Sequence, residues 1–80
     1  MIELPELEGV RMEFETTFNN ERDSLISIRK QNFTQTEIAN WLGKSLRTIQ
    51  HFEKGRNYDP FILTGYRVMG EVISSSRLKV

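Results

Sequence analysis

Residues 35–55 decide the fold of this chain, and they read QTEIANWLGKSLRTIQHFEKG. Two small residues, Ala39 and Gly43, lie four positions apart, and Ile49 follows six positions later. Further apolar residues recur around these positions, namely Ile38, Leu42 and Phe52. This spacing predicts two short helices that cross at a tight turn, which is the arrangement of a helix-turn-helix.

The first of these helices has clear ends in the sequence. Thr34 is a good N-cap, and Glu37 follows three residues later, as a capping box requires. We therefore expect this helix over residues 35–42, where Gly43 ends it in the left-handed conformation of a tight turn. Ala39 is expected at the crossing of the two helices, because a larger side chain would push them apart.

Two more helices are expected after the turn. Ser45 caps a helix over residues 46–54, and Gly55 ends it. The Asp-Pro pair at 59–60 starts the last helix, with Asp as N-cap and Pro in the first turn. The serines at 74–76 are expected to fray into a tail. The inner face of the last helix is expected to contain Ile62 or Leu63, Tyr66, Met69 and Ile73.

The N-terminal part of the chain is ambiguous. A helix is expected over residues 21–31, after a break at the Asn pair 19–20. Residues 10–18 read VRMEFETTF, and their apolar side chains fit both the strand period and the helical spacing. We favour a helix, because a lone strand would need a partner that this chain does not otherwise offer. A strand that pairs with its copy across a dimer is the alternative.

These elements predict an all-α fold, a compact bundle of four to five helices that contains the helix-turn-helix. We expect the chain to divide into an acidic N-terminal extension (1–20), a helix-turn-helix domain (21–75), for which DNA binding is expected, and a tail (76–80). The net charge is zero, but residues 1–23 hold seven acidic and two basic residues, whereas residues 24–80 hold nine basic and four acidic ones. A basic domain with an acidic extension has the local electrostatic footprint of a DNA-binding protein.

The composition excludes several classes of chemistry. Without cysteine, the chain forms neither disulfides nor thiolate metal sites. His51 is the only histidine, so we expect no zinc site and no Ser-His-Asp hydrolase. No nucleophile–base pair or phosphate loop is visible, so we expect neither an enzyme nor a cofactor. No apolar run approaches membrane-spanning length, and the acidic start does not resemble a secretory signal, so we expect a cytoplasmic protein without membrane contact.

Positions between Leu25 and Val72 carry a resemblance to a known family. They are Arg29, Phe33-Thr34-Gln35, Ile38-Ala39, Leu42-Gly43, Ser45, Thr48-Ile49, Phe52-Glu53-Lys54-Gly55 and Pro60. Taken jointly, these residues resemble the Cro/C1-type (XRE-like) helix-turn-helix family of phage and bacterial transcriptional regulators. The resemblance implies that the exposed face of the helix over 46–54 reads DNA.

The positions that correspond to base-reading residues are Ser45, Leu46, Arg47, Gln50 and His51. Their chemistry fits this role, because Arg47 can bond guanine O6 and N7, Gln50 can bond adenine, and Leu46 can meet a thymine methyl group. Phosphate contacts are expected at the N-terminus of the preceding helix and around the presumed groove. The expected phosphate-contacting residues are Thr34, Gln35, Lys44, Thr48, Lys54, Arg56 and Asn57.

The resemblance also implies a buried pair between Arg29 and Glu53. The spacing between Arg29 and Gln35 is one residue short of the family pattern, so a local hydrogen bond of Glu53 is the alternative. Lys44 also departs from the pattern, because a small apolar residue usually follows the turn glycine.

Trp41 stands at a position that is normally polar in the family. We expect it to pack under the N-terminal extension, against Phe14 or Phe18. A dimer surface or a partner surface is the alternative.

The expected function is sequence-specific binding of double-stranded DNA by a transcriptional regulator. We expect a small autoregulatory repressor, phage Cro-like or anti-CRISPR-associated, that binds an inverted repeat as a homodimer with half-sites about one helical turn apart. The alternative is an antitoxin or protein-interaction module whose N-terminal extension binds a toxin or polymerase partner. In a third hypothesis, the acidic extension folds over the basic face and moderates non-specific DNA binding.

Overall fold

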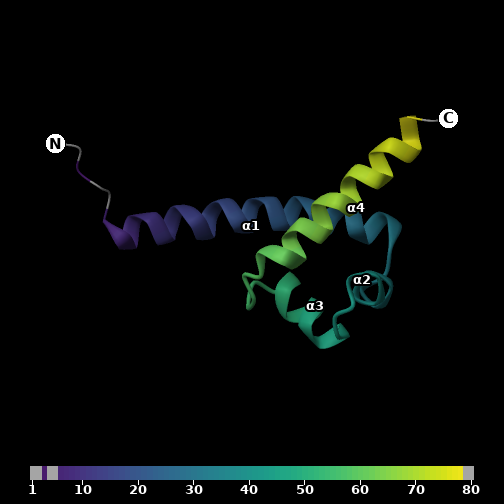
Figure 1. Cartoon of the computed structure of the whole chain (residues 1–80), viewed down its shortest axis with the longest axis horizontal. Helices are drawn as coiled ribbons and strands as arrows, with labels where there is room; N and C mark the ends of the chain where they lie inside the picture. Colours follow the sequence, from purple (N-terminus) through teal and green to yellow (C-terminus); the bar gives the residue numbers. More distant parts are fainter. Residues whose placement is uncertain (1–2, 4–5, 79–80) are drawn as a thin grey trace.

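The computed structural model describes residues 3 and 6–78, except for the side chains of residues 77 and 78. Within these residues the chain forms helices and no strand, which confirms the all-α fold class (Figure 1). The helices are, in order, α1 (Leu7–Asn32), α2 (Gln35–Leu42), α3 (Leu46–Glu53) and α4 (Pro60–Leu78).

Helix α1 is continuous over 26 residues, so the expected break at residues 19–20 is wrong, as is the strand alternative for residues 10–18. Phe18, Arg22 and Arg29 lie on one face of the helix, one and then two turns apart, and are all buried. Their packing continues the helix through the Asn pair, because tertiary burial outweighs the low helix propensity of Asn. Residues 7–17, in the N-terminal half of α1, project from the other three helices and are called the arm below (Figure 1).

The ends of α2 and the start of α3 match the sequence signals. The Thr34 hydroxyl accepts the N–H of Glu37 at 3.1 Å, and the Glu37 carboxylate accepts the N–H of Thr34 at 2.9 Å. Ser45 caps α3 by accepting the N–H of Thr48 at 3.2 Å. The expected capping box and the Ser45 cap are therefore confirmed.

Both short helices end at a glycine with positive φ, 68° at Gly43 and 79° at Gly55. The residue after Gly43 donates its N–H to the carbonyl of Ala39, and the residue after Gly55 donates to the carbonyl of His51, both at 2.9 Å. These bonds satisfy the last carbonyls of each helix in the Schellman arrangement. The turn between α2 and α3 and the loop after α3 are therefore fixed by backbone hydrogen bonds.

Helix α4 supplies the centre of the core. Ile62, Leu63, Tyr66 and Met69 are buried, and Ile73 packs against them, as the sequence predicts. The helix continues through residues 74–76, so the expected fraying of the serines is wrong. After Gly70 no Gly or Pro interrupts the helix, and serine alone is a weak helix breaker.

An aromatic cluster fastens the arm of α1 to the loop before α4. The ring of Phe18 lies 5.1 Å from that of Tyr58 and 6.0 Å from that of Phe52, and Phe14 lies 5.7 Å from Phe18. The expected contact of Trp41 with Phe14 or Phe18 is wrong. Trp41 instead borders a groove that Phe33 also lines. Helix α2, which carries Trp41, follows the C-terminal end of α1, whereas Phe14 and Phe18 lie in the N-terminal half of α1.

Candidate nucleic-acid interface

Glu53, the last residue of α3, joins all four helices of the described residues through its buried carboxylate. Arg29 of α1 donates to both carboxylate oxygens, at 3.0 Å from Nε and 2.6 Å from Nη2. Gln35 of α2 donates to Oε1 at 3.1 Å, and the Tyr66 hydroxyl of α4 donates to Oε2 at 2.5 Å. The Arg29–Glu53 pair is thus present, and a purely local hydrogen bond of Glu53 is excluded.

This network fixes the direction in which α3 points. The side chains of Arg29 and Glu53 are only 8% and 7% exposed, so their charges compensate each other away from water. Burial, together with the hydrogen bond to Glu53, raises the pKa of Tyr66 above its ordinary value, so the hydroxyl stays protonated and donates. Helix α3 is therefore held at its C-terminal end by neighbours on each of the other helices.

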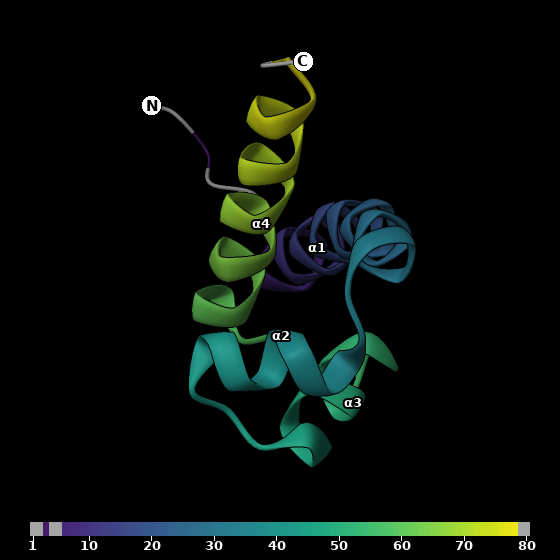
Figure 2. The ribbon, with the colours of Figure 1, turned by 90° about the vertical axis from the view of Figure 1, so that its right-hand side faces the viewer.

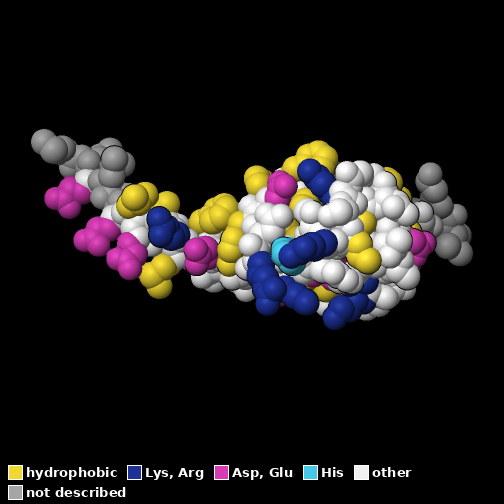
Figure 3. All heavy atoms as spheres, turned by 90° about the horizontal axis from the view of Figure 1, so that it is seen from below, with side chains coloured by type: hydrophobic (Ala, Val, Ile, Leu, Met, Phe, Trp, Pro, Cys, Tyr) yellow, Lys and Arg dark blue, Asp and Glu magenta, His cyan; other side chains and the backbone are white. Residues whose placement is uncertain are grey.

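The outer side of α3 is a polar stripe. Arg47, Gln50, His51 and Lys54 follow the spacing i, i+3, i+4 and i+7, which places them on one face of a helix. Ile49 and Phe52 lie on the opposite face and are fully buried. Seen from the α3 side, Lys and Arg side chains gather around the single histidine (Figure 3).

The N-terminal end of α3 carries the remaining predicted base-reading residues. Leu46 is 41% exposed, and Ser45 is exposed. The hydroxyl groups of Ser45 and Thr48 are hydrogen-bonded to each other at 2.8 Å. This end of α3 therefore offers both an apolar side chain and hydroxyl groups beside the polar stripe.

Of the predicted phosphate-contacting residues, Lys54 ends the stripe and two others follow it directly in the sequence. Lys54 caps the C-terminus of α3, and Arg56 and Asn57 lie in the loop that Gly55 begins. Lys54 and Arg56 are exposed, and Asn57 is half-buried. These residues extend the basic surface beyond the end of α3.

The other predicted phosphate-contacting residues make contacts within the protein. The Thr34 hydroxyl serves the capping box of α2, and the Gln35 carboxamide turns inward to Glu53. The ammonium group of Lys44 lies 5.2 Å from the ring centroid of Phe61 on α4, within the range of a cation–π contact. Lys44 therefore lies apart from the residues at the end of α3.

The acidic arm is separate from this surface. Glu8, Glu13 and Glu15 lie on the projecting half of α1, and Figure 3 shows acidic side chains along the arm and away from the basic cluster. Because this half is a continuation of a rigid helix, it does not fold over the basic face of its own chain. The hypothesis of such a cover is therefore wrong for residues 7–17.

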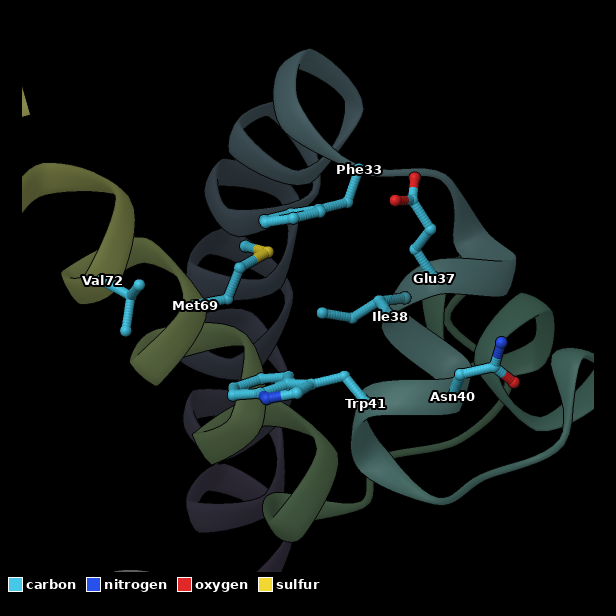
Figure 4. Close-up of a pocket in the computed structure, with 7 residues that line it drawn as sticks. All are labelled: Phe33, Glu37, Ile38, Asn40, Trp41, Met69 and Val72. Atoms are coloured by element: carbon cyan, nitrogen blue, oxygen red, sulfur yellow. The ribbon is translucent and has the colours of Figure 1, made fainter. Parts of the chain in front are cut away.

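Sequence reasoning missed an apolar groove of about 460 Å³ between the end of α1, α2 and α4 (Figure 4). Its apolar lining consists of Phe33, Ile38, Trp41, Met69 and Val72, with Glu37 and Asn40 at the α2 side. The available signal was the spacing of Phe61, Val68 and Val72, which forms a second apolar stripe on α4 besides the buried one.

Comparisons with protein-family models, with curated proteins and with solved structures find no match. Among the described residues, no group of His, Cys, Asp and Glu side chains is arranged to hold a metal ion. No helix in the described part of the chain combines the length and the apolar character of a membrane span.

Proposed function

We propose that this chain is a sequence-specific, double-stranded DNA-binding transcriptional regulator that inserts α3 into the major groove. The observation that carries the proposal is the stripe of Arg47, Gln50, His51 and Lys54 on the outer side of α3. A helix fits the major groove, and Arg and Gln side chains can form bidentate hydrogen bonds with the edges of guanine and adenine there. Within the stripe, Arg47, Gln50 and His51 are thus chemically suited to base reading, and Lys54 at its end is suited to a phosphate contact.

The capped turn between α2 and α3 supports the same function. In helix-turn-helix proteins, the first helix lies across the DNA backbone while the second enters the groove. Helix α2 presents its N-terminus, where backbone N–H groups favour a phosphate, and Lys54 and Arg56 follow α3 on the other side. Contacts of this kind set the register of the protein without reading sequence.

We infer that the biological role is that of an autoregulatory repressor, phage Cro-like or anti-CRISPR-associated, which acts as a homodimer on an inverted repeat. A bound dimer blocks RNA polymerase without further chemistry. The net charge of the chain is zero, but basic side chains gather around His51 and the acidic arm lies away from them. This local positive charge supports binding to the DNA backbone.

The experiment is a footprint of the full chain on the DNA that precedes its own coding sequence. Arg47→Ala is expected to abolish protection of the specific site while the circular-dichroism spectrum stays unchanged, because Arg47 is exposed and supports no core contact. Arg11→Ala, which removes the same charge from the arm, is the matched control and is expected to keep the footprint. Protection that survives in Arg47→Ala contradicts the proposal.

A second candidate function is supported by the arm itself. Leu7 is 78% exposed, Met12 63% and Phe14 52%, on a projecting helix that also carries glutamates. Exposed apolar side chains with an acidic surround suit a basic protein partner, such as a toxin or a polymerase subunit, and would make the chain an antitoxin or interaction module. Co-expression with the product of the neighbouring gene tests this: a complex lost on Leu7→Ser, but kept on Arg47→Ala, supports it.

A further inference from the structure

An apolar face lies beside the groove at the end of the molecule opposite the arm. We define this groove face by Phe33, Trp41, Phe61, Val68 and Val72, which are 38%, 55%, 58%, 40% and 55% exposed. Phe33, Trp41 and Val72 line the same groove, and Figure 4 shows Trp41 lying across it from Phe33. Val68 precedes Val72 by one helical turn, and Phe61 lies two turns before Val68 on the same side of α4.

The size of the groove face exceeds that of scattered surface residues. With about 200 Å² for each aromatic side chain, the exposed parts of Phe33, Trp41 and Phe61 amount to roughly 300 Å². The two valines raise the apolar area to roughly 400–450 Å², within the roughly 300–600 Å² that the largest apolar patch on a typical monomeric protein covers. Interfaces are a little more than half apolar, so such a patch corresponds to about 750 Å² per partner, close to the ~800 Å² of a standard interface.

The occupant of the groove face cannot be the arm of the same chain. Phe33 follows the C-terminal end of α1, whereas the arm is its N-terminal end, and a straight 26-residue helix separates them by about 39 Å. The arm of another copy would bind head to tail, and contacts of that kind continue from copy to copy unless they close a ring. A closed pair requires the same face on both partners.

We propose that the groove face is a self-complementary interface at which two copies of this chain associate through a twofold axis. Figures 1 and 2 show that the groove elements lie to one side of α3 and that the arm points away from them. A twofold axis parallel to the outward direction of α3 therefore turns both α3 helices toward the same side. The pairing of two arms would instead bring acidic helices together and set the two α3 helices at the far ends of the assembly.

Only the reading of an inverted repeat by the two α3 helices of such a dimer rests on the proposed function. The association of the two copies can be tested without DNA. The self-association of the full chain is therefore measured without DNA, by sedimentation equilibrium and by the emission maximum of Trp41. We expect a dimer at micromolar concentration, with Trp41 emission shifting to the blue as the concentration rises, because the half-exposed indole becomes buried.

Val72→Glu places two like charges across the interface and is expected to weaken the dimer about tenfold or more. The matched control is Val10→Glu on the arm, where a valine of similar exposure (44%) is changed in the same way. We expect this variant to stay dimeric. Val68→Lys repeats the test with the opposite charge should Val72→Glu fail to fold.

A wild-type chain that is monomeric throughout overturns the proposal, as does dissociation by Val10→Glu but not by Val72→Glu. Arg47→Ala is expected to leave the dimer intact. A dimer of the expected kind that binds no specific DNA contradicts the proposed function and leaves the interface standing. If the protein binds specific DNA but neither Val72→Glu nor Val68→Lys weakens its self-association, the proposed interface is contradicted and the proposed function stands.

Discussion

The buried pair of Arg29 and Glu53 should carry much more stability than the exposed pair of Glu21 and Arg67. Both pairs join α1 to another helix, but the side chains of the first are 8% and 7% exposed, whereas Arg67 and Glu21 are 50% and 33% exposed. The chemistry of the pairs is the same. Their difference in burial therefore makes a matched comparison.

Glu53→Gln removes the charge that compensates Arg29 and weakens the bonds from Gln35 and Tyr66. Loss of one partner of a buried pair costs about 3–5 kcal/mol. A chain of 80 residues is stable by roughly 4–12 kcal/mol in total, so this loss is a large share of the free energy of unfolding. Glu21→Gln should cost about 1 kcal/mol or less, because exposed pairs contribute little.

Urea titration followed by circular dichroism measures both variants, and an unchanged dependence on urea concentration shows that the folded state has kept its compactness. At roughly 4–8 °C per kcal/mol, the thermal midpoint of Glu53→Gln should fall by 12 °C or more. The double variant Arg29→Met with Glu53→Leu should be less destabilised than the sum of its single changes. Equal losses for Glu53→Gln and Glu21→Gln would refute the claim that this network holds α3.

Two further predictions concern α4. Gly70→Ala should stabilise the chain by up to ~1 kcal/mol in urea titration, because its Cβ would meet Leu25 at an ordinary 3.5 Å. Gly65→Ala should destabilise the chain, because its Cβ would overlap the Leu42 side chain. A Gly65→Ala variant as stable as Gly70→Ala would show that α2 and α4 are not in close contact. Because the pKa of Tyr66 is raised, the folded chain keeps a proton that the unfolded chain loses above about pH 10. The stability due to this group is therefore present below that pH. Above it, the free energy of unfolding falls by up to ~1.4 kcal/mol per pH unit. Tyr66→Phe should lack this loss, so the stability difference between it and the wild type should narrow from pH 9 to pH 11, and a constant difference would contradict the buried donor role.

The short helices were predictable because their signals are local. The capping box of Thr34 and Glu37 and the left-handed Gly43 depend only on neighbouring residues, and the bounds of α2 follow from them. The face of α4 was predictable for a similar reason, because the apolar spacing around Tyr66 repeats with the helical period. The stripe on α3 then follows as the face opposite Ile49.

The features that sequence reasoning missed depend on packing between distant residues. The Asn pair at 19–20 stays helical because Phe18 and Arg22 are buried on either side of it. The Arg29–Glu53 pair forms despite the short spacing, because Phe33 is extended and lets α2 begin at once. The place of Trp41 depends on the direction of α1 relative to α2, which no local pattern contains.

We propose that the exposed face of α3 reads DNA bases. The most direct test is the affinity of the full chain for its own promoter and for random DNA of equal length, measured by fluorescence anisotropy over a range of salt concentrations. The promoter should bind at least about 10³-fold more tightly, and Arg47→Ala should remove this ratio, while Lys54→Ala should weaken both DNAs alike and reduce the salt slope by about 1. Equal binding of the two DNAs by the wild type, or a ratio that Arg47→Ala leaves unchanged, would contradict the claim.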